Sequence, residues 1–278
     1  MASIIPNTFK LSIFTLYCEK NDTKIKYIID YILDYIIDIS MASNKLLEPF
    51  YNSDENVIEI GVDEAGRGPM FGRVYAAAVV LPKHDETFDY SNIKDSKMFH
   101  SKKKINEVAE YIKQNALYWH VSYADEKTID SINILQATQQ CMHESILNIK
   151  KRVTDAEKDK SLYLLIDGNY FKPITQVNKQ TNRLDVIPYT CVEGGDHKFY
   201  SIAAASILAK VSRDNYISEL CEKYPYLSER YCIDSNMGYG AKKHMDGIKE
   251  FGITQWHRRT FGICKQFQDA DIHYENDT

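Results

Sequence analysis

Two adjacent carboxylates, Asp63 and Glu64, come directly after a short apolar run and lead into the turn Gly66-Arg67-Gly68. Carboxylates at the end of a strand lie where open α/β sheets place their chemistry. The two glycines lack a Cβ, so the backbone of this turn can approach a ligand closely. The Arg67 guanidinium offers a fixed positive charge that suits a phosphate. An isolated Asp-Glu pair is more often a solvated acidic turn, but the complete stretch 61–69 (GVDEAGRGP) favours a phosphate-handling site.

The elements that must position these residues alternate between strand-like and helix-like segments from residue 57 onward. Short apolar or alternating runs predict strands at 57–62, 74–81, 117–123, 162–166 and 186–192. Apolar residues at helical spacing predict helices at 101–114, 128–150 and 201–223. The strand 162–166 ends at a further carboxylate, Asp167. Such alternation predicts an α/β domain with a central sheet and helices on its faces.

Composition limits the classes of protein to consider. The 278 residues carry a formal net charge of −5, whereas a protein that coats nucleic acid is normally basic, so any nucleic acid must bind a local patch. The six cysteines form no C-x-x-C pair, which argues against zinc and against a disulfide framework. No apolar stretch reaches the ~18 residues of a membrane span, and the N-terminus lacks a signal-peptide pattern. We expect a cytoplasmic protein without membrane contact.

The first 56 residues differ from the rest in their pattern of apolar and polar residues. Between residues 27 and 39, rows of Tyr, Ile and Asp recur every four positions, which predicts an amphipathic helix with a broad apolar arc and a thin acidic stripe. The acidic row could bind a metal, but a solvated helix face is the favoured interpretation. Segment 9–16 alternates weakly as a strand would, and 40–56 is polar like a linker. We therefore expect an N-terminal extension over 1–56 and a main domain over 57–278.

Five motifs, in order, resemble those of the ribonuclease HII family. They lie at 63–69 (DEAGRGP), 94–97 (KDSK), 165–168 (LIDG), 195–214 and 236–261. The resemblance extends over roughly residues 57 to 263. It implies a ribonuclease H-like α/β fold: a mixed central sheet flanked by helices, with a small helical C-terminal part and, in this chain, the short N-terminal extension.

The resemblance also implies a metal site. The family's four metal-binding acids fall on Asp63, Glu64, Asp167 and Asp196. Asp214 lies in a matched motif too, but we expect it to pair with a nearby cation instead. Two-metal hydrolysis of a phosphodiester needs ions ~3.5–4 Å apart, and hard oxygen ligands select Mg²⁺ or Mn²⁺. Crowded carboxylates repel one another until cations bind.

Substrate contacts follow from the same resemblance. It implies that the ribonucleotide is held by Gly66, Arg67 and Gly68, through backbone and phosphate, and by Tyr239, which packs against the sugar near the 2′-hydroxyl. Further phosphate contacts are implied for Ser96, Lys97 and Lys210. The stretch 242–265 holds six Lys or Arg against two acids, which suits a duplex backbone.

The implied reaction is endonucleolytic. We expect cleavage of the RNA strand of RNA/DNA hybrids, and cleavage 5′ of ribonucleotides embedded in duplex DNA, leaving a 3′-hydroxyl and a 5′-phosphate. One alternative is a non-cleaving hybrid-binding protein, against which the four intact acids argue. Another is a junction resolvase of the same superfold, which has no need of a 2′-hydroxyl sensor. We expect a monomer.

Overall fold

The computed structural model describes residues 47–83, 85, 87–156, 159–178 and 182–267. The chain divides into two compact units, residues 1–46 and residues 47–278. The strand expected at 9–16, the helix expected at 27–39 and Cys18 lie outside the described residues. Among the described helices, none is long and apolar enough to span a membrane.

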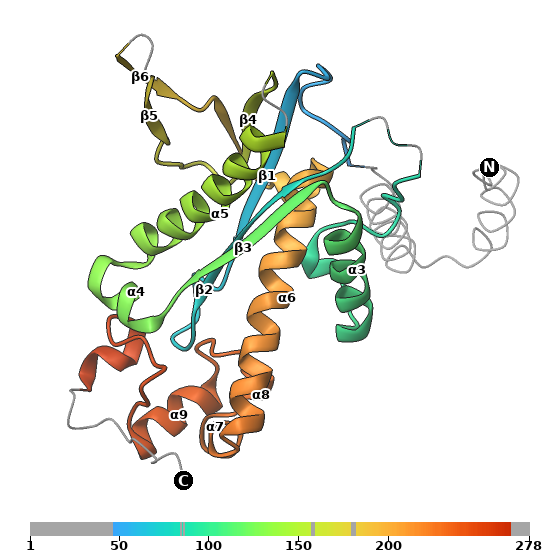
Figure 1. The fold of residues 1–278 in the computed structure, drawn as a ribbon. Coiled ribbons are helices and arrows are strands. Elements are labelled where there is room, and N and C mark those ends of the chain that lie inside the picture. The colour runs from blue at the N-terminus through green and yellow to red at the C-terminus, as the bar shows by residue number, and fades with distance from the viewer. Residues whose placement is uncertain (1–46, 84, 86, 157–158, 179–181, 268–278) are drawn as a thin grey trace, which may run out of the picture. The chain divides into compact units, whose positions relative to one another are not determined.

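A five-stranded mixed sheet forms the centre of the second unit (Figure 1). Its strands, in spatial order, are β3 (Tyr118–Ala124), β2 (Val74–Val80), β1 (Val57–Ala65), β4 (Ser161–Asp167) and β7 (Tyr189–Val192). β1 pairs antiparallel with β2 and parallel with β4, and β4 pairs parallel with β7. The expected mixed α/β architecture is confirmed.

Alternation along the strands assigns each face of the sheet to different helices. Ala76 and Ala78 of β2 pack in one core cluster with the long helix α5 (Ile134–Ala156). Their neighbour Ala77 packs in another with α3 (Lys102–Asn115) and α6 (Tyr200–Lys223). Because successive side chains of a strand point to opposite faces, the sheet is sandwiched between α5 and the pair α3–α6.

The odd-numbered residues of β1 face α6, and this places the first carboxylate. A Cβ added to Gly61 would lie 2.2 Å from the backbone carbon of Ser201, so α6 rests directly on the strand there. The Ser201 hydroxyl donates to Glu59, and the Ser206 hydroxyl, further along α6, hydrogen-bonds Asp63. The close approach therefore holds Asp63 beneath the first third of α6.

Short helices complete the unit, as expected of the C-terminal part. They are α7 (Tyr226–Tyr231), α8 (Ile233–Asn236), α9 (Lys242–Phe251) and the 3₁₀ turn η3 (Gly262–Gln266), and they share a core cluster with the end of α6. Two further 3₁₀ turns, η1 (Ser96–Met98) and η2 (Gly195–His197), lie in loops that carry predicted site residues.

Three expected boundaries are wrong. The helix expected at 128–150 is two helices, α4 (Glu126–Ile132) and α5, because Asn133 between them adopts a left-handed φ of 67°. The expected connection at 151–160 is helical as far as Ala156. The strand expected at 186–192 begins only after Pro188, which has no amide hydrogen to give to a ladder. Before it, β5 (Thr175–Asn178) and β6 (Arg183–Val186) form an unexpected hairpin.

Candidate active site

Three segments of the chain carry the four predicted acids, and they place Asp63 beside Asp167 and Asp167 beside the turn of Asp196. The register of β1 on β4 pairs Val62 with Ile166, so Asp63 and Asp167 extend from neighbouring strands at the same level. The Oδ1 atom of Asp167 accepts a hydrogen bond of 2.7 Å from the Gly195 amide, which ties down the turn carrying Asp196. A Cβ at Gly195 would lie 2.4 Å from Cδ1 of Ile202, so a larger residue at this position would have to displace the end of that side chain.

The four acids act on one another electrostatically. Burial raises the pKa of Asp63 well above its ordinary value, and the charges of Glu64 and Asp167 add to that effect. Burial also raises the pKa of Glu64, against the influence of Arg67. The pKa of Asp167 is raised by burial and further by Asp196. Without cations, the cluster holds negative charge at a cost that a bound divalent ion would offset.

Two flanking cations partly neutralise the cluster. Arg67 pairs with Glu64 at 3.1 Å, and the Lys97 ammonium lies 3.3 Å from Asp196. The Lys97 side chain is 77% exposed whereas that of Asp196 is 4% exposed, so solvent or a ligand can displace the lysine. Within the described residues, the group of three donors whose atoms lie within 4.8 Å of one another is Asp95, Asp196 and His197. Of the four predicted acids this group contains Asp196 alone, so among the described residues no three of the predicted acids offer ligand atoms that close to one another.

The four predicted acids offer ligand atoms that suit a hard divalent cation. The ligand atoms on offer are carboxylate oxygens, which Mg²⁺ and Mn²⁺ prefer. Buried Asp63 and partly exposed Asp167 give such an ion a dry side and an open side. The pKa values of Asp63 and Asp167 are raised mainly by burial and further by neighbouring carboxylates, and a bound cation would offset both effects.

The predicted substrate residues form a surface beside the acids. A Cβ added to Gly68 would lie 3.5 Å from the Tyr239 ring, so the glycine turn and the tyrosine face each other across a narrow gap. Tyr239 is 51% exposed, and the Arg67 side chain is 49% exposed. Lys210 donates to Asp214 at 2.8 Å, which confirms the expected pairing of Asp214 with a nearby cation.

The comparison with known proteins decides the family. A family model described as Ribonuclease HII matches residues 60–264. The chain belongs to the ribonuclease HII family. It is therefore a ribonuclease H, and membership in this family implies endoribonuclease activity on RNA/DNA hybrids. The family match lies entirely within the second compact unit.

Relatives cover most of the chain. Ribonuclease HII of Bacteroides thetaiotaomicron is 42% identical over 220 residues, 78% of this chain and 95% of the relative. Ribonuclease HII of Neisseria meningitidis serogroup B is 39% identical over 206 residues, 74% of this chain and 93% of the relative.

Two solved structures support the fold alone. Ribonuclease HII of Archaeoglobus fulgidus, solved with PCNA, matches with a TM-score of 0.56 at 23% identity, over 74% of this chain and 96% of that one. Bst ribonuclease HIII, solved with Mn²⁺, matches with a TM-score of 0.50 at 16% identity, over 75% of this chain and 72% of that one.

Ser96 lies inside this ribonuclease rather than on its surface. It is 4% exposed, and its hydroxyl oxygen lies 3.0 Å from that of Ser206. Ser206 in turn hydrogen-bonds Asp63. The two hydroxyl groups therefore link the loop of Lys97 to the first carboxylate through the protein interior.

Arg258 is the main residue of the ribonuclease site that sequence reasoning placed wrongly. We expected the cations of 242–265 to face a duplex, but Arg258 is fully buried. Its guanidinium donates to four backbone carbonyl groups around the glycine turn, those of Gly66 (2.7 Å), Arg67 (3.1 Å), Pro69 (2.8 Å) and Gly72 (2.8 Å). Burial lowers the pKa of Arg258 to about 9, which leaves it charged at neutral pH.

A second buried guanidinium, that of Arg213, supports the same turn. It donates to the carbonyl groups of Phe71 at 3.3 Å and Met237 at 2.8 Å. The amide groups of Arg67 and Gly68 make no hydrogen bond within the described part of the chain. The turn thus presents free donors beside Tyr239, as an anion-binding loop does.

A pair of buried histidines holds the Tyr239 loop of the ribonuclease. His244 Nδ1 lies 2.8 Å from the Tyr239 carbonyl oxygen and must donate to it, which leaves its Nε2 as an acceptor. The Nε2 atom of His257 lies 3.1 Å from the Nε2 atom of His244 and donates to it, since the Nδ1 atom of His257 accepts from the Thr254 amide at 2.9 Å. Both rings are therefore neutral, and burial lowers the pKa of each. We infer a positioning role for them rather than a catalytic one.

The chain enters the catalytic unit close to the fourth acid. The Glu48 amide donates to the Lys198 carbonyl at 2.7 Å, and the Tyr200 amide donates to the Glu48 carbonyl at 3.2 Å. Further along, buried Glu59 accepts from the amides of Tyr51 at 2.8 Å and Asn52 at 3.1 Å. Residues 47–56 are thus fastened to β1 and to the start of α6.

Proposed function

We propose that this ribonuclease cleaves the RNA strand of RNA/DNA hybrids and also cuts 5′ of ribonucleotides embedded in duplex DNA, using two Mg²⁺ or Mn²⁺ ions. The observation that carries the proposal is the position of the buried acid cluster next to the exposed surface of Gly68 and Tyr239. A carboxylate cluster alone fits many nucleases, whereas an aromatic ring against a glycine turn also provides a surface for a ribose.

The metal ligands in this proposal are Asp63, Glu64, Asp167 and Asp196. When bound, the ions supply activation of the attacking water and stabilisation of the leaving 3′ oxygen. The protein's own part is to hold the ligands in place: Ser206 supports Asp63 and the Gly195 amide supports Asp167. The Lys97 ammonium, now beside Asp196, is placed to transfer to a substrate phosphate when cations enter.

The substrate contacts divide into sugar and phosphate contacts. Tyr239 packs on the ribose, and the free amides of Arg67 and Gly68 bind the 2′-hydroxyl or the adjacent phosphate. The side chains of Arg67, Lys97 and Lys210 bind phosphates. We give Ser96 a supporting role, because its buried hydroxyl is engaged with Ser206. Every group comes from one chain, which supports action as a monomer.

Gel analysis of cleavage tests the proposal directly. The substrates are a DNA duplex with one ribonucleotide, an RNA/DNA hybrid, and an all-DNA duplex of the same sequence. Cleavage at the ribonucleotide with a 3′-hydroxyl product, and none of the all-DNA duplex, is the expected result. Binding without cleavage in Mg²⁺ and in Mn²⁺ would instead identify a hybrid-binding protein. Cleavage of the hybrid alone would remove the single-ribonucleotide activity from the proposal.

The metal stoichiometry needs a separate measurement. Titration of Mn²⁺ into the protein with a non-cleavable duplex, followed by calorimetry, should show two ions per chain. The Asp167→Asn variant should lose at least one of them. A single ion in the wild-type complex would contradict the two-metal part of the proposal.

A further inference from the structure

The segment from Lys94 to Lys104 carries a concentration of positive charge, of which the proposed function uses Lys97 alone. It holds five lysines, Lys94, Lys97, Lys102, Lys103 and Lys104, all of them exposed. Its one acid, Asp95, is 4% exposed. In a chain of net charge −5 this is a local basic surface, which we call the α3 ridge.

Three of these lysines stand at the unfavourable end of a helix. Ser101 caps α3, and Lys102, Lys103 and Lys104 fill its first turn, which contains no acid. The N-terminus of a helix carries partial positive charge, so cations there destabilise it. Three lysines at this position indicate that the charge serves something other than the stability of α3.

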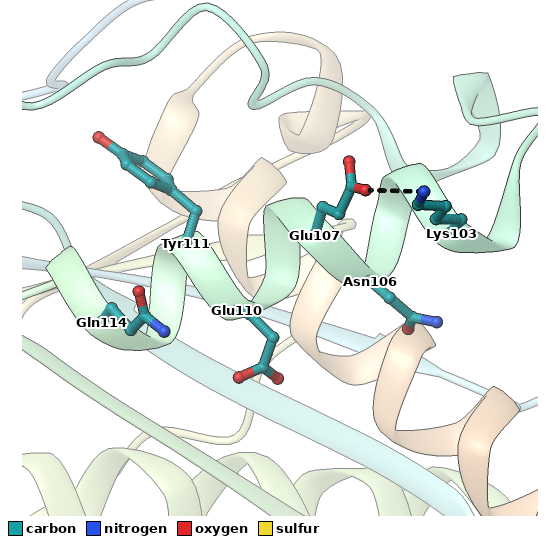
Figure 2. Close-up of a pocket in the computed structure, with 6 residues that line it drawn as sticks. All are labelled: Lys103, Asn106, Glu107, Glu110, Tyr111 and Gln114. Atoms are coloured by element: carbon teal, nitrogen blue, oxygen red, sulfur yellow. Dashed lines mark ion pairs between the residues drawn. The ribbon is translucent and has the colours of Figure 1, made fainter.

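The acids of α3 leave this charge largely uncompensated. Figure 2 shows Glu107 and Glu110 further along the helix, around a shallow depression of about 540 Å³ that Lys103 also lines. Lys103 and Lys104 share Glu107, each at 4.0 Å, the outer limit of an ion pair. Glu110 pairs instead with Lys113 at 2.7 Å, at the other end of the helix.

The α3 ridge is continuous with the active site. At one end Lys97 lies 3.3 Å from the carboxylate of Asp196. At the other, the Lys102 ammonium donates to the Ser218 hydroxyl of α6 at 2.7 Å, one turn beyond Asp214. Lys97 thus joins the ridge to the acid cluster, and Lys102 joins it to α6.

We infer that the α3 ridge binds the phosphate backbone of the nucleic-acid duplex outside the cleavage site. This inference rests on the proposed function, which brings a duplex to the acid cluster. The ammonium groups that bind the phosphates are those of Lys102, Lys103 and Lys104. Lysine is a point charge on a flexible stem without the geometry to read bases, so the binding is independent of sequence.

The test compares two charge-matched variants. K102Q/K103Q/K104Q removes three of the five lysines of the ridge, and K127Q/K151Q/K172Q removes three exposed lysines from α4, α5 and the loop after β4. Binding is measured with Ca²⁺ in place of Mg²⁺ over a salt series. Two duplexes are compared, each with one ribonucleotide, of ~10 and ~30 base pairs. Both offer the same contacts at the cleavage site, and the longer one adds phosphates outside it.

On the long duplex, the ridge variant should bind at least tenfold more weakly, and its log–log salt slope should fall by ~0.9 for each phosphate that the removed lysines neutralise in the wild type. On the short duplex its affinity should fall by less, and the control variant should follow the wild type. The Tm of the ridge variant should be equal to or above that of the wild type, because positive charge leaves the first turn of α3. Weaker binding therefore cannot come from loss of fold.

Equal salt slopes for the ridge variant and the wild type on the long duplex would overturn the inference. Equal losses of affinity in the ridge and control variants would overturn it as well, because they would reflect net charge alone. Failure of the proposed function looks different, since the wild-type enzyme would then not cleave at the ribonucleotide.

Discussion

Replacement of Arg258 by lysine tests how much the buried guanidinium contributes to the glycine turn. The side chain makes four hydrogen bonds to carbonyl groups of residues 66–72, between 2.7 and 3.1 Å long. Guanidinium donates from three nitrogens spread in a plane, whereas the lysine ammonium is one nitrogen. We expect it to reach at most two of the four carbonyl groups, although it keeps the charge.

The two missing hydrogen bonds give the magnitude. A hydrogen bond to a charged group contributes about 1.5–3 kcal/mol net, so R258K should lower the free energy of unfolding by about 3–6 kcal/mol. The total for a folded domain is about 5–15 kcal/mol, so the variant should lose a large part of its stability. The cleavage rate should fall too, because the amides of Arg67 and Gly68 lose the carbonyl anchors that orient them.

Denaturant unfolding of the metal-free protein measures the first effect, and kcat/KM on a single-ribonucleotide duplex measures the second. R259K is the matched control, since the partly exposed Arg259 lies next in sequence. A loss below about 1 kcal/mol for R258K, less than one such bond, would show that other donors replace the guanidinium and would refute the reasoning. A large stability loss with unchanged kcat/KM would confine Arg258 to the fold.

Other predictions concern the acids and the Tyr239 loop. Asp63→Asn should abolish cleavage yet stabilise the metal-free protein in thermal unfolding, because it removes a buried charge from the cluster; lower stability would contradict this. Asp214→Asn should still cleave, and a folded but inactive variant would show that Asp214 belongs to the site. The pKa values of His244 and His257 are lowered in the fold, so the unfolded state takes up protons first as the pH falls. Stability should therefore drop below pH ~6.5, with a slope of up to about 1.4 kcal/mol per pH unit for each histidine. His257→Asn should flatten that slope in denaturant unfolding, and an unchanged slope would exclude His257 as its source. Tyr239→Ala should slow cleavage roughly ten- to hundredfold, since stacking contributes ~1–3 kcal/mol, with Tyr239→Phe milder; unchanged kinetics in the alanine variant would remove Tyr239 from the substrate surface.

The parts of the fold that could be predicted are those in which a run of consecutive residues has the apolar pattern of a buried strand or helix. β2 is buried on both faces, so its apolar run identifies it as a strand without further information. The β5–β6 hairpin was missed because its apolar residues, including Val177 and Leu184, are exposed and make no buried pattern. The break at Asn133 was missed because apolar residues keep helical spacing across it, and only the φ value shows the interruption.

The same distinction applies to the site. Carboxylates at strand ends can be predicted locally, because a strand brings its own last residue to the sheet edge. The roles of Arg258 and Arg213 depend on carbonyl groups distant in sequence, of which Gly66 is 192 residues from Arg258. In a sequence, buried Arg258 and partly exposed Arg259 look alike as members of a basic stretch. Every residue has a backbone carbonyl group, so residue types do not reveal which carbonyl groups a buried arginine will contact.

Backbone hydrogen bonds of Glu48 with Lys198 and Tyr200 fix the position of the chain at the N-terminal side of the catalytic unit. Glu48 is thereby paired with a residue two positions after Asp196, and two residues span at most about 7 Å of chain. A binding module joined directly to Leu47 in place of residues 1–46 would be tethered near Asp196, and a short tether gives an effective concentration in the millimolar range. Fusion at this end is therefore a direct means to change which nucleic acids the enzyme encounters, with no alteration of the carboxylates.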